Sequence, residues 1–98
     1  MADEEEEKVV AEAVVITSDM PDAMKEVAIA TTRDAMNEYS IDKDIATAIK
    51  KKFDEHAEYM GTWHCIVGSD FRAFVTHESK HFIFFYIGKM AICLYKTG

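Results

Sequence analysis

The hydrophobic pattern of this chain changes at Gly61, with helical spacing before that glycine and short strand-like runs after it. Between Pro21 and Tyr39, apolar positions recur at three- and four-residue steps, as on one face of an amphipathic helix. Ser18 and Asp19 precede Pro21, and cap-type side chains ahead of a proline predict the start of this helix. The predicted buried face comprises Met24, Val27, Ala28, Thr31, Ala35 and Tyr39.

A second helix is predicted to begin near Asp42. Asp42 and Asp44 fall at its N-terminal end, where the helix dipole favours negative charge. Lys50–Lys52 fall in its C-terminal half and are interpreted as a solvated face. Four-residue steps predict a buried stripe made of Ile45, Ile49 and Phe53.

Short strands are predicted on both sides of the helices. Val14–Ile16 is a β-branched run ahead of them. Four runs rich in aromatic and β-branched residues follow, at 62–67, 71–76, 81–87 and 90–95. Turn-forming residues separate these runs, which predicts four strands in meander order, antiparallel where a hairpin joins them.

The run Phe82–Ile87 is apolar at both sets of alternating positions, so both faces of that strand should be covered. The two helices can cover one face, and the second cover implies a partner surface. The expected fold is therefore α+β, with two helices packed on an antiparallel sheet that a second subunit completes.

Composition and charge narrow the class of protein. At 98 residues and 49% hydrophobic the chain makes one domain, and a domain this short gains by oligomerising. The net charge is −7, and Asp3–Glu7 alone supplies five acids, so residues 1–12 are predicted to be a flexible acidic leader to a domain at 13–98. An acidic protein without a basic face is a poor candidate for nucleic-acid binding.

The predicted cellular location rests on two features that the sequence lacks, a secretory signal and a membrane-spanning stretch. The N-terminus has no basic start and apolar run of a secretory signal, and no apolar stretch is long enough to span a membrane. Cys65 and Cys93 lie inside apolar runs with no metal-binding spacing, which predicts reduced, buried thiols. We expect a soluble protein of the cytoplasm.

Two chemical motifs are weighed and set aside. His77–His81 reads HExxH, the pattern of zinc proteases, but it lies across a turn between strands. If extended, the two histidines would be about 13 Å apart at ~3.3 Å per residue, too far for one metal ion. His64 and Cys65 are neighbours in a predicted strand and point to opposite faces, so they cannot share a proton. Neither enzymatic activity nor a cofactor is expected.

Three segments carry a resemblance to a known family: 62–71 (TWHCIVGSDF), 74–88 (FVTHESKHFIFFYIG) and 91–98 (AICLYKTG). Together with the helical segment 39–55 (YSIDKDIATAIKKKFDE), they closely resemble the eight-kilodalton dynein light chains of the hub type, over about residues 13–98. The resemblance implies a strand-swapped homodimer of two helices and a five-stranded sheet. The strand at 71–76 would cross to the partner's sheet and leave a groove on each side of the dimer.

The same resemblance implies a function in binding. A client segment, often with a Thr-Gln-Thr-like core, would lie in each groove as an added antiparallel strand. The expected partners are a second copy, the dynein intermediate chain and other proteins with such motifs, in the cytoplasm and on the cytoskeleton. The alternative is a specialised axonemal or cytoplasmic dynein subunit with few other clients.

Positions that match the family's motif define the expected site. The helix start at Asp42 and Lys43 would recognise the client glutamine, and the groove floor would comprise Phe82, Phe84, Tyr86, Ala91 and Cys93. The swapped strand that pairs with the client matches Phe71, Arg72, Ala73, Phe74, Val75, Thr76 and His77. The expected dimer interface comprises His64, Phe71, Val75 and Thr76.

Several of these positions depart from the family pattern. Asp42 replaces a glutamate, Cys93 replaces a leucine-like residue, and Arg72, Ala73 and Phe74 replace smaller or hydroxyl-bearing residues and a tyrosine. Loss of a hydroxyl at Ala73 removes a hydrogen bond worth roughly 0.5–1.5 kcal/mol. Relative to the family, two extra residues near Glu58–Gly61 are expected only to lengthen a loop. The groove is expected to remain, with a changed client motif.

Two residues are expected to control dimerisation. His64 would lie buried between two copies and resist protonation, so acidification toward about pH 5 should split the dimer. Thr97 matches a serine that can be phosphorylated in the family, and a phosphate there would repel its twin. An ordinary polar residue in the C-terminal tail is an equal alternative for Thr97.

Overall fold

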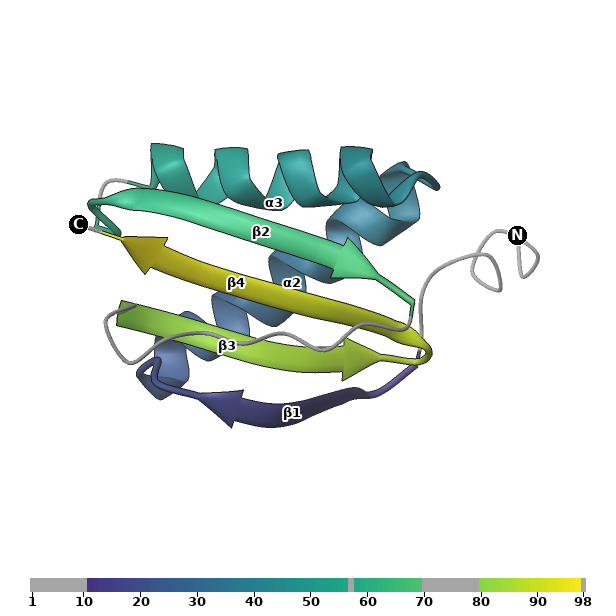
Figure 1. Ribbon diagram of the computed structural model, residues 1–98, viewed down its shortest axis with the longest axis horizontal. Coiled ribbons are helices and arrows are strands. Elements are labelled where there is room, and N and C mark those ends of the chain that lie inside the picture. Colours follow the sequence, from purple (N-terminus) through teal and green to yellow (C-terminus); the bar gives the residue numbers. More distant parts are fainter. Residues whose placement is uncertain (1–10, 57, 70–79, 98) are drawn as a thin grey trace.

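A computed structural model of the chain describes residues 11–56, 58–69 and 80–97. Its elements in chain order are β1 (Ala13–Ser18), α2 (Asp22–Glu38), α3 (Asp42–Glu55), β2 (Thr62–Gly68), β3 (Lys80–Ile87) and β4 (Met90–Thr97) (Figure 1). Both helices predicted from the spacing of apolar residues are confirmed. The strand predicted at 71–76, and with it Phe71–His77, lies outside the described residues.

The four described strands form one antiparallel sheet in the order β1-β3-β4-β2. The turn at Gly88–Lys89 joins β3 and β4 as a hairpin, as predicted. The predicted meander order is wrong for β2, because β2 pairs with β4 and lies on the far side of it from β3. The most apolar strands thereby take the centre of the sheet, where they lose most contact with water.

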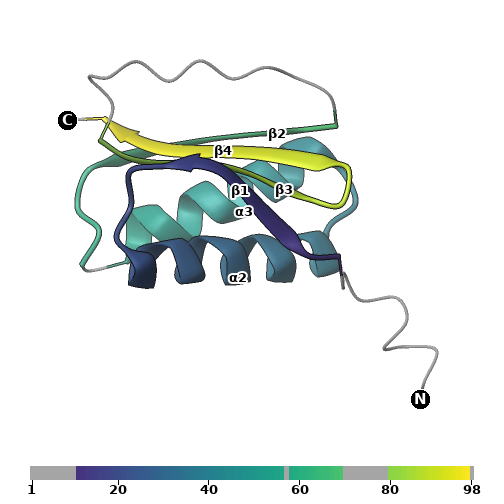
Figure 2. The ribbon, with the colours of Figure 1, turned by 90° about the horizontal axis from the view of Figure 1, so that it is seen from below.

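Both helices cover the same face of the sheet, which gives the molecule two layers (Figure 2). Ile83, Phe85 and Ile87 of β3 are buried beneath them. Thr32 faces the core instead of the predicted Thr31, and its hydroxyl donates to the carbonyl oxygen of Ala28 at 2.8 Å, which satisfies the polar group. The buried helix residues are Met24, Ala28, Thr32 and Ala35 on α2, and Ile45, Ile49 and Phe53 on α3.

Tyr39 was predicted to end the buried face of the first helix, and that prediction is wrong. It lies just beyond α2 in an extended conformation and is 38% exposed.

Neither described helix combines the length and the apolar composition that a segment crossing a bilayer needs.

The loop between α3 and β2 is part of the core. Tyr59 is buried and stacks on Phe53 with ring centroids 5.3 Å apart, and Trp63 packs against Phe53 at 4.8 Å. The indole N–H of Trp63 donates to the carbonyl oxygen of Tyr59 at 2.9 Å. The expectation that this segment only lengthens a loop is therefore wrong. Tyr59 covers the tryptophan ring, and its carbonyl oxygen accepts the one hydrogen bond that the indole can donate.

Ser18 and Asp19 fold the chain from β1 toward α2 and do not cap the helix. The Ser18 hydroxyl oxygen accepts from the backbone N–H of Met20 at 3.0 Å and donates to the carbonyl of Phe82 at 3.3 Å. The backbone N–H of Asp19 donates to the same carbonyl at 2.8 Å. The N-cap position belongs to Pro21, which supplies no side-chain bond. The predicted cap is thus wrong, because these side chains lie too far ahead of the first turn.

Candidate functional site

The face of the sheet opposite the helices carries the predicted groove floor. Phe82, Phe84 and Tyr86 alternate with the buried core residues of β3, so they point away from the helix layer, and all three are half-buried. The rings of Phe84 and Tyr86 lie 5.6 Å apart in a tilted arrangement. This aromatic row is the most apolar feature of the opposite face of β3.

Neighbouring strands extend this face on one side. Cys93 of β4 lies opposite Phe84 and Ala91 lies opposite Tyr86, and both small side chains are fully buried. Ile66 of β2 lies opposite Cys93 and is 47% exposed. Residues directly opposite each other in a sheet point to one face, so these five positions form a continuous apolar surface.

The structure places Cys65 of β2 partly buried and Cys93 of β4 buried, and both are free cysteines. Burial raises the pKa of Cys93 to about 11. Burial, with a smaller contribution from Cys93, raises the pKa of Cys65 to about 12. Both thiols therefore stay protonated at neutral pH and serve as apolar packing groups, not nucleophiles.

His64 lies near the C-terminal end of β4, on the same face as Ile66. Its ring stacks on Tyr95 with centroids 5.1 Å apart, and its Nε2 lies 3.1 Å from the Thr97 hydroxyl oxygen. The sequence singled out His64 and Thr97 separately, and only the fold shows that they touch. The other residues of the predicted dimer interface, Phe71, Val75 and Thr76, lie outside the described residues.

Asp42 and Lys43 form the start of α3, as predicted, and both are exposed. Ile41 occupies the N-cap position and supplies no side-chain hydrogen bond to the first turn. The first intrahelical bond runs from the N–H of Ile45 to the carbonyl of Ile41 at 3.0 Å. The N–H groups ahead of Ile45 therefore point out of the helix end without a cap from Ile41.

Within one chain, the two halves of the predicted site lie in different layers. Asp42 and Lys43 begin α3, which belongs to the helix layer (Figures 1 and 2). Phe84 and Tyr86 alternate with the buried residues of β3, so they point away from that layer. The fold does not bring these residues into one pocket of a single chain.

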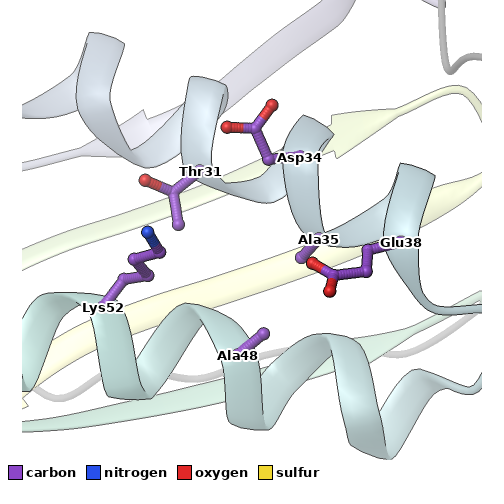
Figure 3. Close-up of a pocket in the computed structure, with 6 residues that line it drawn as sticks. All are labelled: Thr31, Asp34, Ala35, Glu38, Ala48 and Lys52. Carbon is purple, nitrogen blue, oxygen red and sulfur yellow. The ribbon is translucent and has the colours of Figure 1, made fainter.

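A hollow between α2 and α3 was not foreseen from the sequence. It is lined by Thr31, Asp34, Ala35, Glu38, Ala48 and Lys52. Ala35 and Ala48 keep the helices close at its base, and Lys52 reaches across toward Thr31 (Figure 3). Small residues on facing helical positions were the available signal. Its polar rim offers no arrangement of nucleophile and base.

The HExxH motif raises the question of a metal site. Among residues 11–56, 58–69 and 80–97, no three His, Cys, Asp or Glu side chains gather to hold a metal ion. Three residues of the HExxH segment, 77–79, lie outside these ranges. His81, its last residue, is in β3 with a φ of 54°.

Comparisons with known proteins agree with this architecture. Two solved structures of the dynein light chain-like domain of FhCaBP2, a Fasciola hepatica calcium-binding protein, are similar to the chain at 19% identity. The native form gives a TM-score of 0.75 and covers 90% of this chain and 93% of that one. The mercury derivative gives 0.74, with 93% and 97% covered.

At that level of identity, the structural likeness shows the fold alone. The family model described as Dynein light chain type 1 matches residues 12–97, which is nearly the whole chain. The α+β topology and the aromatic face of the sheet both agree with this family. The chain is a member of the dynein light chain family.

Proposed function

We propose that the chain is a non-enzymatic adaptor that binds extended segments of partner proteins as a homodimer. It acts as a light chain of dynein motors in the cytoplasm and on the cytoskeleton. The observation that carries the proposal is the separation of the two halves of the site. An aromatic floor at Phe84 and Tyr86 and a helix start at Asp42 and Lys43 lie in different layers of one chain.

A second copy removes this separation. In the proposed dimer, the helix start of one subunit would lie beside the floor of the other. Ile66 is 47% exposed on that face, and an apolar surface of this kind favours burial against a partner. Phe71, Val75 and Thr76 are proposed to complete the contact through the swapped strand, with His64 beside it.

Clients are proposed to bind by strand addition. Backbone groups of Phe71–His77 would pair with the client, and main-chain hydrogen bonds supply an affinity that does not depend on client sequence. Alternate client side chains would then lie over Phe82, Phe84 and Tyr86, with Ala91 and Cys93 beneath. Small buried residues at those two positions leave the aromatic rings as the contact surface.

Specificity is proposed to come from the helix start. Uncapped N–H groups of a first helical turn attract an oxygen acceptor. Asp42 and Asp44 are both in that turn, so an anionic client side chain would be repelled. A glutamine offers an amide oxygen without charge, which fits this arrangement better than a glutamate does.

A calorimetric titration tests the proposal. A peptide with a Thr-Gln-Thr core should bind at one per chain, and its Gln-to-Ala counterpart should bind about fivefold or more weakly, because a lost hydrogen bond costs about 1 kcal/mol or more. Tyr86→Ala should weaken both peptides. Met60→Ala, which removes a 78% exposed side chain in the α3–β2 loop at the other end of α3, is the matched control and should leave binding unchanged.

Two results would count against the proposal. A monomer at high concentration by sedimentation would remove the dimer on which the groove depends. A stable dimer that binds neither peptide would retain the family fold and reject the Thr-Gln-Thr motif. The chain would then be a specialised dynein subunit, with specificity changed at Asp42 and Arg72–Phe74.

A further inference from the structure

We propose that the outer edge of β1 is a second docking edge, which takes an extended partner segment of about six β-branched residues with Lys or Arg at both ends. This edge is separate from the groove proposed above and does not depend on it. β1 lies at the opposite side of the described sheet from β2 (Figure 1).

The side chains of β1 are unusually exposed for an apolar strand. Val14 is 54% exposed, Val15 40% and Ile16 55%. β1 pairs with β3 on one side, and no other described strand pairs with it. An exposed β-branched strand with a free side offers both backbone hydrogen bonds and apolar contact to an added strand.

Most devices that protect a sheet edge are missing from β1. The strand AVVITS contains no charged residue and no proline. A register shift between Val15 and Thr17 leaves Ile16 without an opposite residue on β3, which is the one irregularity of the edge. Natural edges of this length are usually blocked by lysine, proline or a covering segment, so this one is suited to pairing.

Acidic residues lie at both ends of the strand. Glu12 and Asp19 flank it directly, and both are exposed. Asp22 follows with its side chain 92% exposed and pairs with Lys25 at 3.1 Å. One base, Lys89, lies in the β3–β4 turn near the other end of the strand. A segment with basic ends is therefore complementary to the edge.

The same charges select against a second copy of this chain. If two β1 strands paired antiparallel with all six residues matched, residue 13 would lie opposite 18, and Glu12 would lie opposite Asp19 at both ends. Like charges directly opposite in a sheet are destabilising. An in-register parallel pair would place the two copies of Glu12 side by side, and likewise the two copies of Asp19. The edge thus favours a different partner with basic ends.

Fluorescence anisotropy with the full chain tests this edge. The labelled probes are Lys-Lys-Val-Thr-Val-Thr-Val-Thr-Lys-Lys and the same peptide with glutamate in place of lysine. We expect the basic probe to bind at least about tenfold more tightly at low salt, and the difference to shrink as salt screens the exposed charges. Hydrogen exchange should show new protection within β1 when the basic probe is bound.

Charge reversal supplies the decisive variants. Glu12→Lys with Asp19→Lys should reverse the preference toward the acidic probe, since both positions are exposed and the strand itself is unchanged. Glu55→Lys with Glu58→Lys makes the same change in net charge at exposed positions elsewhere and should keep the original preference. Circular dichroism of both variants checks that the fold is retained.

Three outcomes would overturn the proposal. Equal binding of the two probes, or none, would remove the charge complementarity. Protection that appears outside β1, or displacement of the basic probe by a Thr-Gln-Thr peptide, would assign the probe to the groove. Assemblies larger than a dimer that disappear in Val14→Lys would show that the edge binds a second copy. Failure of the groove to bind its own peptide leaves this test intact.

Discussion

Asp54 shows how one exposed side chain can connect two elements. Its Oδ2 is bonded to the ammonium of Lys50 one turn earlier in α3, and its Oδ1 accepts the backbone N–H of Trp63 at 3.1 Å. The hydrogen bond from Lys50 lowers the pKa of Asp54, against a smaller opposing effect of burial. The carboxylate thus connects the end of α3 to the start of β2.

Two substitutions separate the roles of this carboxylate. Asp54→Asn keeps an oxygen for Trp63 but loses the ion pair, so we expect a loss of about 0.2–1 kcal/mol in the free energy of unfolding at pH 7. Asp54→Ala also leaves the Trp63 N–H without this partner and should cost roughly 0.5–1.5 kcal/mol more. Urea denaturation at fixed protein concentration measures both. Equal stability of the two variants would contradict a contribution from the Trp63 bond.

The pH dependence of the Asp54 pair has a definite sign. The pKa of Asp54 is lower in the folded protein than its ordinary value of 3.8. The stabilisation is therefore fully present above about pH 5, and it is lost as pH falls through the lowered pKa. The difference between wild type and Asp54→Asn should shrink in that acidic range and stay constant from about pH 5 to 8.

The junction of α3 and β2 depends on a glycine in a conformation that other residues rarely adopt. Gly61 has a φ of 127°, and a Cβ added there would meet the Lys96 side chain, with Cγ at 2.7 Å. Lys96 in turn lies over the Trp63 ring, its Nζ 5.8 Å from the ring centroid. The turn glycine Gly88, by contrast, has a φ of 61° and its nearest such contact is 3.4 Å away.

These geometries predict unequal costs for the same substitution. Gly61→Ala should lower the free energy of unfolding by about 2–3 kcal/mol, because the backbone is strained and Lys96 must move. Gly88→Ala should cost about 1 kcal/mol, since the left-handed region is accessible to alanine. Thermal and urea unfolding of the two variants give the comparison. A Gly88→Ala variant less stable than Gly61→Ala would contradict it.

At the scale of the whole molecule, His64 and Thr97 connect the far end of the sheet to the proposed dimer. The 3.1 Å contact between them places any charge on Thr97 directly beside His64. Thr97→Glu should weaken the dimer, raising its dissociation constant about tenfold or more, because each carboxylate would face its twin across the interface. Thr97→Val, which removes the hydroxyl without adding charge, is the control and should stay dimeric.

Sedimentation velocity over a range of concentrations measures this shift. The same series at about pH 5 tests the dissociation expected from His64, which remains a prediction. An unchanged dimer for Thr97→Glu would move Thr97 outside the interface, and an unchanged dimer at about pH 5 would do the same for His64.

The helices and the strand content were predictable because they depend on local periodicity. Ile45, Ile49 and Phe53 fall on one stripe of any helix through them, and all three are buried as predicted. Alternation in β3 likewise predicts that Phe84 and Tyr86 share a face opposite Phe85, as the structure confirms. These inferences need only the geometry of one element.

The errors have a different origin, since they concern contacts between different elements of the fold. Ser18 has a side chain suited to capping a helix. In the structure its hydroxyl instead bonds the carbonyl of Phe82 and the backbone N–H of Met20, at the corner between β1 and α2. The sequence pattern places Tyr59 in a loop, and only the fold shows that its ring packs against Phe53 of α3 and Trp63 of β2. β2 takes its place beside β4 because pairing there completes an apolar sheet.

The sequence by itself determined the two helices, the apolar strands, the acidic balance and the family to which the chain is assigned. All of these depend on residue type and on spacing within a short window. Only the tertiary structure decided that α3's first turn and the aromatic floor lie in different layers, that His64 touches Thr97, and that β1 has an exposed side. Those facts depend on strand order and on which face each element presents, which short-range spacing does not specify.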